Sequence, residues 1–130
     1  MTLEEGLYSY LQSQTGVTAL VGTRIYPLLL QQVETLPAVA YQRISTQRNS
    51  SHGGPAKASI ARIQFDALAA TMTQAQAVLA AIRNACDGVG GTLGGGVVVS
   101  TMQADDEQTF YDEETRYKRA TLDLVVYFYE

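Results

Sequence analysis

A strict alternation of apolar and polar residues near the end of the chain constrains the fold most. Between Arg116 and Tyr129, apolar side chains recur at every second position: Ala120, Leu122, Leu124, Val126 and Phe128. A period of two places successive side chains on opposite faces of a β-strand, so this stretch predicts a long strand with one face toward a core. The opposite face then carries Val125, Tyr127 and Tyr129. Single exposed apolar residues are ordinary on a protein surface, whereas three at one strand end favour a subunit contact.

Further strands are predicted by alternation and by β-branched or aromatic residues. Ile60–Ala69 alternates clearly, and Ala38–Thr46 is rich in strand-forming residues after an entry proline. We also expect a strand over Val97–Ala104 and a short extended piece over Arg24–Pro27.

Two helices are predicted by apolar residues at helical spacing behind capping-box pairs. Thr2 and Glu5 open a helix over 3–14, with Gly16 at the position of a left-handed stop and one more possible turn over 17–21. Thr73 and Gln76 open the second helix, over 74–86.

This order of elements predicts an α+β fold of one domain over residues 1–130. Consecutive strands joined by loops favour an antiparallel sheet of four to five strands, and the two amphipathic helices can pack on one of its faces. The hydrophobic content of 46% in 130 residues is sufficient for a core.

Two loops stand out between these elements. Residues 47–59 are polar and too long for a tight hairpin turn, so we expect a projecting, mobile arm. Residues 88–96 include six glycines in nine positions. This segment follows a helix instead of opening one and lacks a phosphate-binding lysine, so a flexible link is favoured over a phosphate cradle.

The residue types needed for catalysis or metal binding are sparse. His52 is the only histidine and lies in the polar arm, and Cys86, the only cysteine, falls on an apolar helix face. Clustered acids over 105–114 could hold a hard cation, but they lack the spacing of a calcium loop, and a solvated turn between strands is favoured. Phe110 and Tyr111 in that turn are candidate contact residues. We therefore expect no enzyme, no metal and no cofactor.

Charge and hydropathy argue against two further classes of partner. The net charge is −4 with nine basic residues, so a nucleic-acid grip by counterion release is not expected. The N-terminus lacks the features of a secretory signal, and no apolar run approaches the roughly 20 residues of a membrane span.

A series of short motifs resembles one known family along nearly the whole chain. The motifs are GVTALVGTRIYP at 16–27, LPAVAYQ at 36–42, RIQFD at 62–66, GTLGG at 91–95, and the tail pattern Asp105-Asp106, Tyr111-Asp112, Tyr117 and Asp123. In this order they resemble the tail-completion, or head-tail joining, proteins of long-tailed bacteriophages and prophages. The arm at 47–59 resembles the family least.

The resemblance implies a structural virion protein and offers no catalytic residue. It implies a six-fold ring of identical subunits, assembled in the host cytoplasm, that caps the tail tube and docks to the head connector while DNA only passes through. A head-closure adaptor of the same particle is the alternative, and a small metal- or ligand-binding domain is a third. The candidate interface residues are Arg48, His52, Lys57, Phe110, Tyr111, Tyr117, Val125, Tyr127 and Tyr129.

Overall fold

The computed structural model describes residues 2–27, 37–48, 59–93, 96–111 and 118–129. Its helices are α1 (Leu3–Gln12), α2 (Thr15–Val21) and α3 (Met72–Cys86). Its strands are β1 (Ile25–Pro27), β2 (Ala38–Gln47), β3 (Ser59–Ala69), β4 (Gly91–Leu93), β5 (Val97–Tyr111) and β6 (Lys118–Tyr129).

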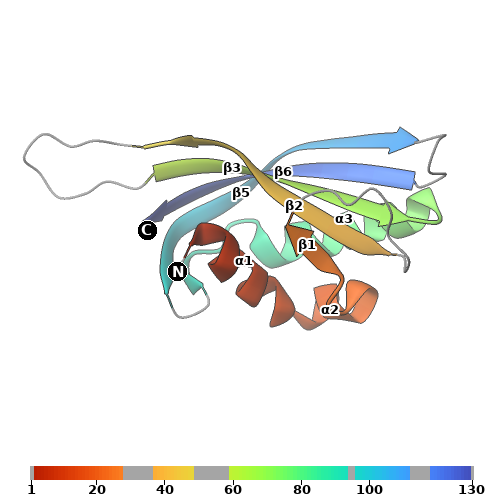
Figure 1. Cartoon of the computed structure of the whole chain (residues 1–130), viewed down its shortest axis with the longest axis horizontal. Coiled ribbons are helices and arrows are strands. Elements are labelled where there is room, and N and C mark those ends of the chain that lie inside the picture. The colour runs from red at the N-terminus through yellow and green to blue at the C-terminus, as the bar shows by residue number, and fades with distance from the viewer. Residues whose placement is uncertain (1, 28–36, 49–58, 94–95, 112–117, 130) are drawn as a thin grey trace, which may run out of the picture.

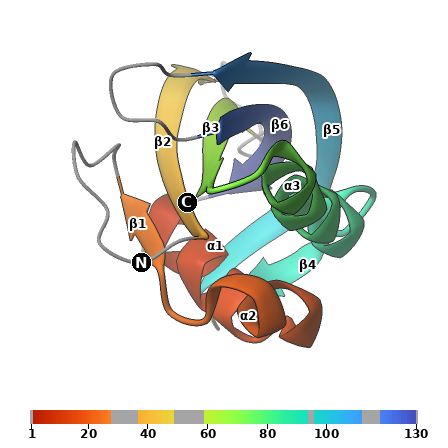
Figure 2. The ribbon, with the colours of Figure 1, turned by 90° about the vertical axis from the view of Figure 1, so that its right-hand side faces the viewer.

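These strands form one six-stranded sheet in the order β1-β2-β3-β6-β5-β4. β1 runs parallel to β2, and every other neighbouring pair is antiparallel. The last strand, β6, therefore lies in the middle, with β3 along one side and β5 along the other. The helices lie together on one side of the sheet, which curls around them (Figures 1 and 2).

The main core fills the space between the helices and this inner face of the sheet. Alternation decides which strand residues enter it, because every second residue of β3 and β6 points to the helices. Its largest fully buried side chains include Leu3, Leu7, Leu11, Ile63, Phe65, Ile82, Leu122, Leu124 and Phe128.

The predicted α+β class and the packing of helices on one face are confirmed, but the elements differ in number. The sheet is mixed and six-stranded, because β1 adds to β2 in the parallel direction and β4 pairs with the start of β5. A third helix, α2, forms where only a possible turn is expected. None of the helices in the described part of the chain is long and apolar enough to cross a membrane.

The caps explain where the helices begin and end. Thr2 and Glu5 form the predicted capping box of α1. Gly22 ends α2 with a positive φ of 59°, which favours glycine, whereas Gly16 lies inside that helix and is no stop. The N-cap of α3 is Thr71 and not Thr73, because the Thr71 hydroxyl accepts a hydrogen bond from a backbone N–H in the first turn.

The acidic turn is the main error of the sequence prediction. Asp105, Asp106 and Glu107 lie within β5, which continues to Tyr111 and pairs with β6 through this stretch. β6 in turn begins at Lys118, two residues later than expected. The ends of the expected arm belong to strands, since β2 runs to position 47 and β3 starts at 59, and residues 49–58 lie outside the described residues.

Candidate interaction surface

The outer face of the sheet, opposite the helices, is buried at the end where β2 begins. There Ala38 and Leu68 form a small second core, against which Tyr26 packs. Beside them Asp66 and Thr121 are also buried, with relative exposures of 9% and 5%. The Thr121 hydroxyl donates to Asp66 Oδ1 at 2.7 Å, so this pair has the hydrogen bond that buried polar groups require.

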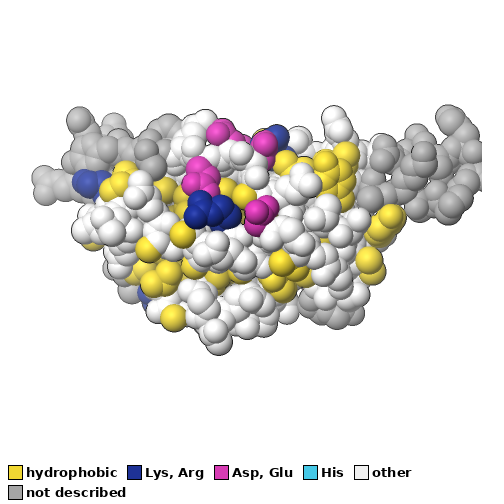
Figure 3. Space-filling view, turned by 180° about the vertical axis from the view of Figure 1, so that it is seen from behind, with side chains coloured by type: hydrophobic (Ala, Val, Ile, Leu, Met, Phe, Trp, Pro, Cys, Tyr) yellow, Lys and Arg dark blue, Asp and Glu magenta, His cyan; other side chains and the backbone are white. Residues whose placement is uncertain are grey.

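At the other end of the outer face, apolar side chains meet across three strands. We call this group the outer-face patch: Ile60, Val98, Val125, Tyr127 and Tyr129. The register brings them together, because Ile60 pairs with Tyr127 and Val98 pairs with Tyr129. Val98 and Tyr129 are 47% and 43% exposed, and Figure 3 shows hydrophobic side chains at the molecular surface. A cross-strand group of this kind is typical of a contact surface.

An ion-pair cluster adjoins the outer-face patch. Arg62 of β3 contacts Asp123 of the neighbouring β6 at 3.1 Å and reaches Asp105 of β5 at 2.7 Å. The hydrogen bond to Asp105, assisted by Asp123, raises the pKa of the Arg62 guanidinium above its usual value. Surface ion pairs contribute little stability, so the cluster chiefly orients three side chains at the border of the patch.

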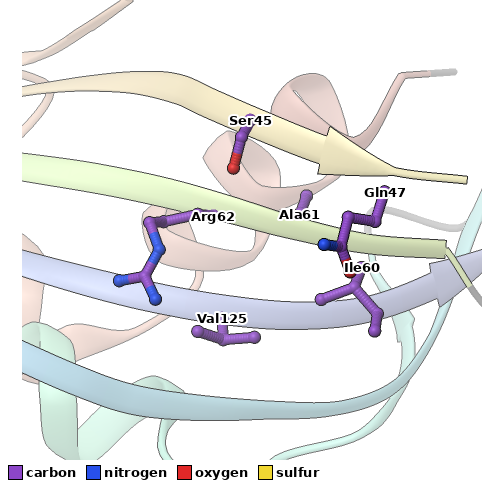
Figure 4. Close-up of a pocket in the computed structure, with 6 residues that line it drawn as sticks. All are labelled: Ser45, Gln47, Ile60, Ala61, Arg62 and Val125. Atoms are coloured by element: carbon purple, nitrogen blue, oxygen red, sulfur yellow. The ribbon is translucent and has the colours of Figure 1, made fainter.

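A depression lies between this cluster and the end of β2. Its lining comes from three neighbouring strands and consists of Ser45, Gln47, Ile60, Ala61, Arg62 and Val125. The close-up shows the side chains of Arg62 and Val125 separated from those of Gln47 and Ile60 along the strands (Figure 4). Amide, guanidinium and aliphatic groups are mixed here, as they are at the borders of protein interfaces.

Strand β5 separates two of the acidic residues that are close together in the sequence. Asp105 meets Arg62 on the outer face, while Glu107 pairs with Arg83 of α3 on the helix side. Among the described residues, no three histidine, cysteine, aspartate or glutamate side chains come together as a metal site. The thiol of Cys86 is buried in the core, and this burial raises its pKa to about 12, so it is protonated at neutral pH.

The structure brings together some of the predicted interface residues. Val125, Tyr127 and Tyr129 share the outer face. Exposed Arg48 follows the end of β2, at the same end of the sheet. Residues 110 and 111 lie at the far end of β5, where only their backbone is described. His52, Lys57 and Tyr117 lie outside the described residues.

The sequence patterns do not single out three other residues of this surface. Ile60 and Arg62 belong to it because β3 alternates, so the residues between its buried positions point outward. Extending the alternation of β3 to its outer face is the signal that identifies these two. Val98 requires the strand register, which brings it beside Tyr129 and is not readable from a single strand.

Comparison with known proteins yields a family and a likeness in fold. The model of the family described as "Tail completion protein gp17" matches residues 5–129. A chain of a solved structure entitled "Virion of native gene transfer agent (GTA) particle" superposes with a TM-score of 0.80 at 20% sequence identity. That alignment covers 97% of this chain and 93% of that chain. No curated protein matches.

Proposed function

The chain belongs to the tail completion protein gp17 family, so it is a structural tail protein of a phage-type virion, and we propose that it works as the terminator ring of that tail. In this role, copies of the chain assemble into a homo-hexameric ring that caps the finished tail tube. The ring presents a docking surface to the head connector. Its partners are therefore further copies of itself, the major tail-tube protein and the connector protein.

The outer-face patch is the observation that supports this role most directly. A subunit that works only by docking needs exposed apolar side chains held on a rigid support, and β3, β5 and β6 supply one. Tyr127 and Tyr129 are suited to such a contact, because a tyrosine adds a large apolar surface at a low cost in side-chain entropy.

The candidate residues outside the patch extend the proposed contact surfaces. Arg48, His52 and Lys57 would act from the segment between β2 and β3, and Phe110, Tyr111 and Tyr117 from the segment between β5 and β6. The net charge of −4 agrees with a ring through which DNA passes without being tightly bound.

Electron microscopy of lysates that lack this protein tests the role. Loss of a terminator should give overlong tails or tails that are not joined to heads. A head-closure adaptor, the second candidate, would instead leave tails of normal length. Normal particles in the absence of the protein would overturn both roles.

Complementation with variants then tests the patch. Replacing Tyr127 and Tyr129 together by Ser should reduce the yield of joined particles at least tenfold, while the purified protein keeps its fold by circular dichroism. The matched control replaces both by Phe, which keeps the apolar area and should restore assembly. Equal yields from the two double variants would remove the patch from the proposal.

A further inference from the structure

The glycine-rich segment that follows α3 is bonded along β5 over its described part, whereas the sequence favours a flexible link. Gly88 donates a backbone hydrogen bond to the carbonyl of Met102 at 2.7 Å, and Met102 donates one back to the carbonyl of Val89 at 3.0 Å. These bonds lie on the side of β5 that faces away from β6. We call residues 87–93 the glycine strap.

Further bonds hold the glycine strap at both of its ends. Near α3, the carboxylate of Asp87 accepts a hydrogen bond from the backbone N–H of Ala104 at 3.0 Å. At the other end, the last three residues of the strap form β4, which pairs antiparallel with positions 97–99 of β5. The strap therefore occupies backbone groups of β5 at intervals from 97 to 104, on the side where an added strand would bond.

Glycine is required where the strap comes closest to β5. A Cβ atom on Gly90 would overlap the backbone oxygen of Ser100 and lie 3.1 Å from its carbonyl carbon. Both neighbours are backbone atoms, so no side-chain rotation could relieve the overlap. Gly88, with φ of 78°, makes the turn into this approach in a region that other residues rarely adopt.

The strap is also fixed from the side of the helices. Its residue Leu93 is 3% exposed and belongs to the main core. α1 approaches the strap closely at Gly6, where an added Cβ would lie 3.3 Å from the carbonyl oxygen of Leu93 and 3.2 Å from the side chain of Val97. Core packing and backbone hydrogen bonds therefore hold the strap in the same position.

The strap replaces the regular edge of β5 with a poor template for a further strand. β4 is the outermost strand on this side of the described sheet, and it is only three residues long. Positions 87–90 belong to no strand. Very short edge strands and irregular covering segments are means by which proteins protect a sheet from pairing with other copies.

The strap also affects the outer-face patch. Thr92 of β4 pairs with Val98 of β5, and Val98 pairs on its other side with Tyr129 of β6. β5 therefore has a neighbouring strand on both sides at the patch. Contacts at this end of the sheet are then available through the side chains of its outer face.

We propose that the glycine strap is a seal that prevents a second copy of this chain from adding a strand to β5. The edge of a sheet can pair with any extended chain, and identical copies are always present where the protein accumulates. With the strap in place, contact through the outer-face patch does not compete with strand addition at the neighbouring edge. The seal is independent of the terminator role.

A single added methyl group tests the seal. Gly90→Ala should lift the strap, so the backbone amides of Met102 and Ala104, whose acceptors belong to the strap, should exchange hydrogen at least about 100-fold faster. Amides that join β3 to β6 should stay protected. The mass in light scattering should rise with concentration beyond that of the wild-type protein. Gly16→Ala is the matched control and should change neither quantity, because a Cβ there meets nothing within 4 Å.

Two further variants separate opening of the strap from a general loss of stability. Asp87→Ala removes the acceptor of the Ala104 N–H without adding an atom, and should speed exchange at Ala104 while the other strap bonds persist. Combining Gly90→Ala with Ala104→Pro should keep the strap open but return the mass to the wild-type value. Proline lacks the N–H that an added strand would bond, and it is tolerated at sheet edges.

Three results would overturn the seal. The first is protected amides with an unchanged mass in Gly90→Ala. The second is rapid exchange at Met102 without a rise in mass, which would make the strap a structural element only. The third is a rise in mass that Ala104→Pro does not reverse. None of these results bears on the terminator role, which the tails in lysates test separately.

Discussion

Truncation of two adjacent residues of β6 should change stability by very different amounts, since their side chains point to opposite faces of the sheet. Phe128 is fully buried, and the Arg43 guanidinium lies over its ring at 5.3 Å from the centroid. Tyr129, the next residue, is 43% exposed in the outer-face patch. A slip of one residue in the register would exchange the two environments, so the comparison tests the placement of the strand.

The expected magnitudes follow from these environments. Phe128→Ala removes a ring from a packed core, which costs about 3–5 kcal/mol. The lost contact with Arg43 adds roughly 0.5 kcal/mol. The same arginine bonds to Glu4, so the substitution also loosens the attachment of α1 to the sheet. Tyr129→Ser removes only surface atoms and should change the free energy of unfolding by about 0.5 kcal/mol or less.

Urea unfolding, followed by circular dichroism, measures both changes. With a denaturant slope of about 2 kcal/mol per molar, Phe128→Ala should lower the midpoint by about 2 M without a change of slope. Tyr129→Ser should move the midpoint by no more than about 0.3 M. A larger shift for Tyr129→Ser than for Phe128→Ala would refute the assignment of the two faces, and with it the proposed patch.

Two further predictions concern buried polar groups. Thr121→Val removes the donor to the buried Asp66 carboxylate and should lower the free energy of unfolding by about 1–3 kcal/mol. Thr121→Ser keeps the hydroxyl and should lower it by less than about half as much. Equal losses for the two variants in thermal melts would count against the hydrogen bond as the cause. Burial raises the pKa of the Cys86 thiol to about 12, whereas in the unfolded chain the pKa of this thiol is about 8.5. The unfolded chain therefore loses this proton first, so the free energy of unfolding should fall as pH rises above about 8.5. The fall should be smaller in Cys86→Ala. Rapid alkylation of the folded wild-type protein at pH 8 would contradict this burial.

The sequence is informative where a residue's environment depends on its own element. The alternation in β3 and β6 is readable because one face of each strand is buried along most of its length. The cap of α1 is readable because Thr2 and Glu5 are three residues apart. Both signals are local, and both are confirmed.

The errors arise where distant residues decide the structure. Three acids in succession resemble a turn, yet Asp105 and Glu107 are accommodated in β5 because Arg62 and Arg83 meet them from β3 and α3. The parallel pairing of β1 depends on where the chain returns to begin β2, and three residues are too few to show a period. The patch is predicted in part, since the tyrosines of β6 follow from alternation, whereas Val98 joins them only through the register.

The central position of β6 has a consequence for the timing of folding during synthesis. β6 is the last strand of this fold to leave the ribosome, yet it alone links the β1-β2-β3 half of the sheet to the β5-β4 half. Until it emerges, β3 and β5 lack the neighbour that joins them, and much of the inner face has no complete core. Nascent chains should therefore remain protease-sensitive until β6 is released, and a subunit could not enter the proposed ring before its own synthesis had passed this point.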